Sequence, residues 1–156
     1  MKLTTLLLGS SLFLGAFFTT AQATELDDYL VENKIIDTHF KIKNSQKLAE
    51  ILTYLSDEDS RTLPLQIDQN TLIEKLRLYP HYIEIEGIIT SQDFKQFSQN
   101  MTTQEIKKLF TDNLTKNCHQ LFEHQFQRVN PYEVRMKLST QEKQYAVELK
   151  NSQCHF

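Results

Sequence analysis

Glycine is scarce in this sequence, and its scarcity excludes several kinds of active site. The 156-residue chain contains three glycines, of which Gly9 and Gly15 lie in the leader described below. Gly87 is therefore the single glycine of the remaining chain, too few for a glycine-rich loop that cradles phosphates. The nucleophile elbow G-x-S-x-G and the C-x-x-C motif of thioredoxin-type oxidoreductases are also absent. We expect Gly87 to mark a bulge or a close approach within its strand.

Positive charge is not in excess either, and this argues against two classes of partner. The chain carries 17 lysines and arginines against 20 aspartates and glutamates, a formal net charge of −3. Nucleic-acid-binding domains usually present a strongly basic surface, and anionic lipid attracts clustered lysines and arginines. We therefore expect no nucleic-acid partner and no docking on a lipid surface.

A leader accounts for the one long apolar stretch. Lys2 supplies a positive start, residues 6–18 (LLLGSSLFLGAFF) form an apolar run, and AQA at 21–23 is a small-x-small cleavage site. These parts in this order are typical of a Sec signal peptide, cut here before Thr24. A membrane anchor is the alternative, but the run is short for a span and lacks a basic flank.

The leader also indicates the compartment. Its brief positive region, together with the absence of tryptophan and of further cysteines, favours a bacterial periplasmic protein, with secretion as the alternative. Removing residues 1–23 takes away Lys2, which lowers the formal net charge to −4 and leaves a chain of single-domain size. No later stretch approaches about 18 apolar residues, so we expect no membrane span in the processed chain.

Residues 24–62 are predicted to form an N-terminal helical segment. A first helix is expected over 25–33, where apolar residues recur at helical spacing behind an acidic first turn. A second helix is expected over 44–59, with Asn44 as its N-cap and an apolar stripe along one side. Between them, residues 35–43 (IIDTHFKIK) alternate apolar and polar side chains, which predicts a short strand.

Residues 63–156 are predicted to form an α+β domain. Alternating segments on either side of a turn at 79–81 predict an antiparallel strand pair, and segments at 132–140 and 144–154 predict a closing hairpin. Between the two pairs, residues 91–126 are predicted to form one or two helices. The long one carries an apolar stripe at i+3 and i+4 steps, formed by Ile106, Leu109, Phe110, Leu114, Cys118, Leu121, Phe122 and Phe126. The expected fold is a small antiparallel sheet with this helix packed on one face, preceded by the N-terminal helical segment.

The two cysteines, Cys118 and Cys154, are each followed by a histidine, His119 and His155. An oxidising compartment favours a disulfide between them. A zinc site would need thiolates and imidazoles that converge on one ion, and neighbouring residues on a helix point about 100° apart. We therefore predict a Cys118–Cys154 disulfide that ties the long helix to the last strand, and no bound metal or cofactor.

The layout from about residue 63 to 154 resembles a group of small exported proteobacterial proteins. Their pattern is Leu-Pro-x-x-Ile/Val-Asp-x-x-Thr, two strands, a helix with a cysteine, and a final strand that ends in cysteine. It is matched here by Leu63, Pro64, Ile67, Asp68, Thr71, Cys118 and Cys154. The resemblance implies a small α+β domain similar to the C-terminal domain of TolA, without an assigned activity. The usual glycine before the C-terminal hairpin is missing here.

Few side chains are candidates for catalysis, and each has a structural interpretation. Glu84 and Glu86 share one side of a strand and could act as an acid–base pair, but clean alternation favours a solvated strand face. His119 and His124 are five residues apart, which is poor spacing for a shared metal on a helix. Asp68 is favoured as a turn or capping residue. No catalytic, cofactor-binding or metal-binding residue is therefore assigned.

These observations favour a non-catalytic periplasmic interaction or accessory protein of the cell envelope over an enzyme. Its partner would be another envelope or secreted protein, and inhibition of a secreted hydrolase is one form of that role. The alternative is a small periplasmic hydrolase whose site is assembled only in the fold. A pocket holding a carboxylate or histidine of shifted pKa would favour the hydrolase, whereas a shallow groove or an exposed apolar patch would favour the binding protein.

Overall fold

The structure, a computed structural model, describes residues 22–67 and 69–156. The predicted leader up to residue 21 and the candidate Asp68 lie outside the described residues. The helices are α1 (Glu25–Glu32), α2 (Ser45–Asp59), α3 (Gln92–Gln99), α4 (Thr103–Lys116), α5 (Cys118–Leu121) and α6 (Gln125–Val129), with short 3-10 turns η1 (Ser60–Thr62) and η2 (Asn151–Gln153). The strands are β1 (Leu65–Gln66), β2 (Thr71–Leu78), β3 (Tyr82–Ile89), β4 (Glu133–Ser139) and β5 (Gln144–Lys150).

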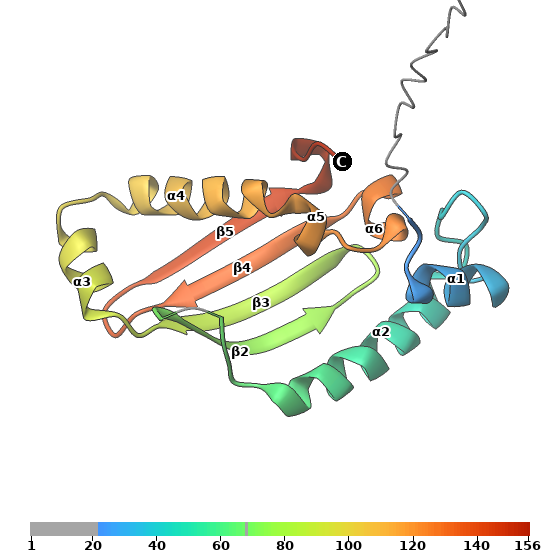
Figure 1. The fold of residues 1–156 in the computed structure, drawn as a ribbon, viewed down its shortest axis with the longest axis horizontal. Helices are drawn as coiled ribbons and strands as arrows, with labels where there is room; N and C mark the ends of the chain where they lie inside the picture. Colours follow the sequence, from blue (N-terminus) through green and yellow to red (C-terminus); the bar gives the residue numbers. More distant parts are fainter. Residues whose placement is uncertain (1–21, 68) are drawn as a thin grey trace, which may run out of the picture.

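The strands form one five-stranded sheet in the order β1-β2-β3-β4-β5, and the predicted α+β class is confirmed. Three ladders are antiparallel, including the predicted pair β2–β3 and the predicted hairpin β4–β5. The ladder between β3 and β4 is parallel. The sheet was expected to be antiparallel throughout, and this ladder is the exception. A parallel pair needs a long crossover, and α3 to α6 supply it. Figure 1 shows these helices running from one end of the sheet to the other.

One face of the sheet is apolar and carries the core. In neighbouring strands, Ile83 pairs with Val134, and Val134 pairs with Leu149, so one apolar row crosses three strands. Helix α4 contacts β5 and helix α2 contacts β2. Leu48 and Leu52 of α2 share one buried cluster with that row, so the predicted N-terminal segment contributes to the same core as the rest of the chain. The domain boundary expected near residue 62 stays a prediction.

The strand predicted over 35–43 does not form. A single bridge joins Ile36 to Ile42, and the chain turns between them. The carboxylate of Asp37 accepts two backbone N–H bonds from the next four residues, at 2.9 and 3.0 Å, and Phe40 takes a positive φ of 60°. These local bonds compete with an extended strand, which is the usual behaviour of aspartate in turns. The same turn lowers the pKa of Asp37 to about 2, first through the N–H of Lys41.

The single long helix predicted from the apolar stripe is divided into three. Helix α4 ends at Lys116 with Asn117 as its C-cap, and α5 and α6 follow as separate short helices. Near the end of α4, side chains compete with backbone N–H groups for the helix carbonyls. Thr115 and Asn117 donate to carbonyls four residues earlier, at 2.9 and 2.8 Å. Because of this break, the residues of the stripe are not equally buried: Phe122 is fully buried, whereas Leu109 is 43 % exposed.

Candidate functional site

The second face of the sheet is polar, and its side chains reach solvent. Cross-strand neighbours there are charged, and we call this surface the open face: Lys75, Arg77, Glu84, Glu86, Arg135, Lys137 and Glu148. The alternation that buries the apolar row in β4 and β5 leaves these residues half-buried or exposed. Charge of both signs is interspersed, so this face suits solvent or a polar partner rather than a second apolar layer.

Glu84 and Glu86 lie on the open face, and Lys75 binds both. Its Nζ lies 2.8 Å from Glu84 Oε2 and 3.3 Å from Glu86 Oε1. The hydrogen bond from Lys75 is the main reason that the pKa of Glu84 lies below its ordinary range. A general acid needs a pKa raised toward neutrality, so this arrangement opposes acid–base work by Glu84.

A cleft with a volume of about 820 Å³ opens at the end of the sheet where β4 begins and β5 ends. Among the described residues, four cationic side chains and one side-chain carboxylate, that of Glu133, line it. The cations are Lys41, Arg128, Arg135 and Lys150. We call this the basic cleft. It concentrates positive charge on a chain whose formal net charge is −3. A concave site lined by one sign of charge raises the local concentration of oppositely charged ligands.

Each arginine of the basic cleft is held in place. The Arg135 guanidinium lies 3.9 Å from the centroid of the Tyr82 ring, and its Nη2 lies 2.6 Å from Glu133 Oε1. The Arg128 guanidinium lies 5.0 Å from the centroid of the Phe156 ring, and its Nε donates to the carbonyl of Phe122 at 2.6 Å. Both planar groups are therefore oriented before any ligand arrives.

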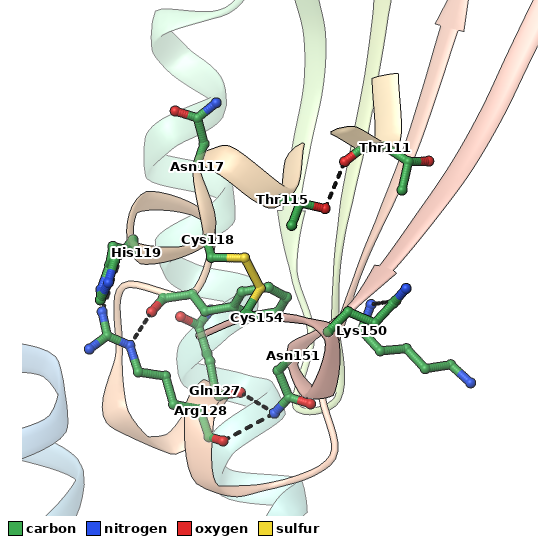
Figure 2. Close-up of a disulfide and its surroundings, with 12 residues drawn as sticks. Thr111, Thr115, Asn117, Cys118, His119, Gln127, Arg128, Lys150, Asn151 and Cys154 are labelled. Atoms are coloured by element: carbon green, nitrogen blue, oxygen red, sulfur yellow. Dashed lines mark hydrogen bonds between the residues drawn. A yellow bond between two sulfur atoms is a disulfide. The ribbon is translucent and has the colours of Figure 1, made fainter. Parts of the chain in front are cut away.

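The two lysines of the basic cleft differ. Lys41 Nζ donates to the carbonyl of Val129. Lys150 Nζ has no hydrogen-bond or ion-pair partner within the part of the chain that the structure describes, and Figure 2 shows this side chain extending away from the other labelled ones. Lys150 is thus a free cation at the edge of the cleft.

The predicted disulfide is confirmed, and it fixes the walls of the basic cleft. Cys118 and Cys154 are bonded, with their Cα atoms 5.8 Å apart (Figure 2). Beside the bond, the side chain of Asn151 donates to the carbonyls of Gln127, Arg128 and Asn130 at 2.9, 3.2 and 2.6 Å. The C-terminal segment is therefore tied covalently to α5, and by hydrogen bonds to α6 and its C-cap Asn130.

The two Cys-His pairs do not form a metal site. Both sulfurs are consumed by the disulfide, so neither is available as a thiolate ligand. The His119 ring instead lies edge-on to Phe156, with the centroids 5.8 Å apart. Over residues 22–67 and 69–156, no group of three or more His, Cys, Asp or Glu side chains is placed to hold a metal ion.

A smaller cleft of about 390 Å³ lies at the other end of the sheet, between the start of α3 and the β4–β5 turn. Lys95 and Glu142 form an ion pair there at 2.7 Å. The hydrogen bond from Lys95 is the main cause of the lowered pKa of Glu142. This carboxylate is paired and exposed, so the smaller cleft offers no group poised for acid–base chemistry.

A part-buried polar junction joins the start of α1 to the start of α6. Thr24 Oγ1 lies 2.7 Å from His124 Nδ1 and donates to Asp27 Oδ2 at 2.9 Å. The same carboxylate accepts the backbone N–H groups of Gln125 at 2.8 Å and Phe126 at 3.3 Å. Because the hydroxyl has one proton and gives it to Asp27, the imidazole must donate to Oγ1. Burial, partly offset by Asp27, lowers the pKa of His124.

This junction has the residue types of a nucleophilic triad, but its hydrogen bonds run in other directions. In a triad the histidine accepts the proton of the hydroxyl, whereas here the carboxylate takes it directly. Thr24 is the N-cap of α1, and Asp27 completes its capping box. The junction is therefore a helix-capping structure shared by α1 and α6.

Sequence reasoning missed both the basic cleft and this junction. Alternation in β4 places Arg135 on the polar side of its strand, which is the one signal that could have pointed to the cleft. Lys41 and Arg128 join it only because the turn after α1 and the break after α4 bring them to the same end of the sheet. The T-x-x-D spacing of Thr24 and Asp27 signals a cap, but not the second helix that Asp27 also caps.

No protein-family model matches this chain, and no curated protein sequence matches it. Among solved structures, it is similar to a protein of Pseudomonas aeruginosa thought to be secreted, with a TM-score of 0.45 and 11% identity over 71% of this chain and 96% of that one. It is also similar to EpsS, the pilotin of the Vibrio vulnificus type 2 secretion system, with a TM-score of 0.44 and 12% identity over 72% of this chain and 96% of that one. At these values neither likeness assigns an activity or a partner to the chain.

Proposed function

We propose that this chain is an exported, non-catalytic interaction protein of the bacterial cell envelope, which acts by binding another envelope or secreted protein. The observation that carries the proposal is the basic cleft at the end of an exposed, charged sheet face. The resemblance to the small exported proteobacterial proteins supports the same role. A charged, rigid, concave surface is suited to steering and orienting a protein partner.

The titratable groups of the described residues favour binding over hydrolysis. The carboxylates of Asp37, Glu84 and Glu142 have lowered pKa values, which keeps them ionised at neutral pH. His124 has a shifted pKa, but its Nδ1 is occupied by the capping hydroxyl of Thr24. A small hydrolase remains the second candidate only through His124, so an activity abolished by His124→Asn would favour it.

Export is part of the proposal. No helix within residues 22–67 and 69–156 combines the length and hydrophobicity that a membrane crossing requires. Cleavage before Thr24 would retain the whole capping box of α1, because its first member is Thr24. Mass spectrometry of protein recovered from the native host should give Thr24 as the N-terminal residue. A full-length, membrane-bound chain would contradict this.

Site-specific photo-crosslinking in the native periplasm tests the binding role. A benzoylphenylalanine at Lys137 or Glu148 places the probe on the open face, and one at Lys108 places it on an exposed part of α4. We expect the open-face probes to give one defined cross-linked protein that the Lys108 probe does not give. Absence of any specific product from Lys137, Glu148 and a third probe at His81 in the basic cleft would refute the proposal.

A further inference from the structure

We propose that the basic cleft binds an acidic peptide segment of the partner protein, an inference that rests on the proposed function. The cleft brings together Lys41, Arg128, Arg135 and Lys150 from four separate stretches of the chain. Among the described residues, Glu133 is the one side-chain carboxylate that lines the cleft. Arg135 already pairs with it, and Glu148, which does not line the cleft, also acts on Arg135. The surplus of positive charge is therefore available to a ligand.

The cations are presented in forms that suit carboxylates. Arg135 uses Nε and Nη2 on Glu133, and Arg128 uses Nε and Nη2 on two backbone carbonyls. In the described part of the chain, the remaining nitrogen of either guanidinium makes no hydrogen bond or ion pair. Lys150 Nζ likewise has no hydrogen-bond or ion-pair partner among the described residues. Arginine donors held in a fixed orientation recognise planar carboxylates with more geometric specificity than a mobile point charge.

The size and lining of the cleft favour a peptide over a small anion. A volume of about 820 Å³ is far larger than one inorganic ion requires, and its cations come from different walls. Apolar surface lies between them, with Val129 and Pro131 on one side and Phe156, 47 % exposed, on another. A segment that alternates carboxylates with apolar side chains matches this pattern, because each kind of side chain meets a complementary surface.

Other polyanions match the site less well. Nucleic acid would be repelled by the net negative charge of the chain as a whole. A bilayer surface attracts clusters of cations that protrude, whereas Arg128 and Arg135 are held against aromatic rings at the cleft. The disulfide and the three hydrogen bonds of Asn151 keep the recess preformed, which lowers the ordering cost of binding a flexible segment.

Selection from a phage-displayed library of random dodecapeptides tests the proposal, and the partner need not be identified first. The protein is used as the full processed chain, as wild type and as Lys150→Glu. Lys143→Glu is the matched control, because it makes the same charge change on an exposed lysine just before the start of β5, outside the basic cleft. We expect peptides rich in Asp and Glu to be enriched on the wild type and on Lys143→Glu, and not on Lys150→Glu.

The most enriched peptide is then synthesised and its Kd is measured by fluorescence anisotropy. We expect Lys150→Glu to weaken binding about tenfold and Lys143→Glu less than about twofold, with weaker binding at high salt. Arg135→Gln is a second cleft variant that should also weaken binding, and circular dichroism checks that every variant is folded. Enrichment of peptides without acidic residues, or acidic peptides that bind Lys150→Glu as well as the wild type, would overturn the proposal.

Two further arms separate the sources of negative charge. Inorganic phosphate alone and vesicles of phosphatidylglycerol and phosphatidylcholine are offered to the same variants. Lys150-dependent binding of phosphate or vesicles, without selection of acidic peptides, would replace the peptide proposal by a phosphate or lipid headgroup site. A partner cross-linked through the open face but indifferent to Lys150→Glu would leave the proposed function standing while the basic cleft proposal fails.

Discussion

The carboxylate of Asp27 accepts the backbone N–H of Gln125 at 2.8 Å, although 98 residues separate the two in sequence. The same side chain completes the capping box at the start of α1, where it accepts from the backbone N and the hydroxyl of Thr24. One fully buried carboxylate thus caps two helices that lie far apart in the sequence. Because α6 forms a wall of the basic cleft, Asp27 also helps to fix the site.

Asp27→Asn should destabilise the fold strongly. The amide is nearly isosteric, but its NH₂ cannot accept the bonds that the carboxylate oxygen accepts, and it loses the charge that favours both helix N-termini. We expect a loss of about 2–4 kcal/mol in the free energy of unfolding, measured by urea denaturation. Asp28→Asn is the control, because Asp28 lies exposed in the same first turn and should cost less than about 1 kcal/mol. Equal effects of the two variants would contradict the shared cap.

The pKa of His124 makes stability depend on pH. Burial lowers this pKa below its ordinary value of 6.5, while Asp27 and Glu123 act in the opposite direction and Arg128 reinforces the lowering. The unfolded chain therefore binds a proton first as pH falls, so the contribution of His124 is complete above pH 6.5 and is lost progressively below it.

We expect the melting temperature of the wild type to fall between about pH 7.5 and pH 5, and the fall to be smaller in His124→Asn. The window stays above pH 5 because the lowered carboxylate pKa values, such as that of Glu84, matter only below their ordinary value of 4.5. His119→Asn is the matched control and should keep the wild-type pH dependence. An unchanged pH profile in His124→Asn would show that His124 is not the titrating group.

Alternation made the sheet predictable, and it worked because the sheet has one buried face. In β5, Tyr145, Val147 and Leu149 are buried while their neighbours are exposed, as the sequence pattern indicates. A shift of the β5 pairing register by one residue would expose all three side chains, so the pattern fixes which face of β5 is buried. The disulfide was predictable for a related reason, because the pairing of two cysteines in an oxidising compartment has one solution.

The elements that sequence reasoning got wrong are those where local polar bonds compete with the pattern. Asp37 turns the chain where alternation predicts a strand, and Asn117 ends a helix that the apolar stripe predicts to continue. The parallel ladder between β3 and β4 depends on where the crossover helices return the chain, which no single segment encodes. The basic cleft depends on all three and was therefore not predictable.

The structure confirms the close approach that was predicted at Gly87, where β2 lies against β3. A β-bulge lies opposite it, because Ile73 pairs with Gly87 and Lys75 pairs with Glu86. A Cβ at this position would lie 2.6 Å from the carbonyl oxygen of Leu72 and 3.1 Å from Ile73 Cδ1. Backbone of the paired strand cannot move aside cheaply, so the ladder itself must shift.

We expect Gly87→Ala to lower the free energy of unfolding by about 2–3 kcal/mol in urea denaturation. Ala146→Val is the control, because it adds bulk to an exposed position of β5 and should change stability by less than about 0.5 kcal/mol. A neutral Gly87→Ala would mean that β2 and β3 are further apart there than the structure places them.

The Cys118–Cys154 bond should stabilise the fold without being required for it. It closes a segment of 36 residues, and in the chain-entropy account such a loop contributes about 2–4 kcal/mol. The core does not depend on it, because Phe122, Phe126 and Leu149 are fully buried around it, and Asn151 still holds the C-terminal segment to α6.

The double variant Cys118→Ala, Cys154→Ala should therefore melt at a lower temperature and retain the circular dichroism spectrum of the wild type. Wild type treated with dithiothreitol should match it, since the two samples lack the same bond. Asn151→Ala combined with the double variant should lower the melting temperature further, because the hydrogen bonds then lost act on the same segment as the disulfide. Thiol titration in denaturant without reductant should find no free thiol in exported wild type. Two free thiols in exported wild type would contradict the disulfide. A double variant with the melting temperature of the wild type would show that the disulfide does not stabilise the walls of the basic cleft.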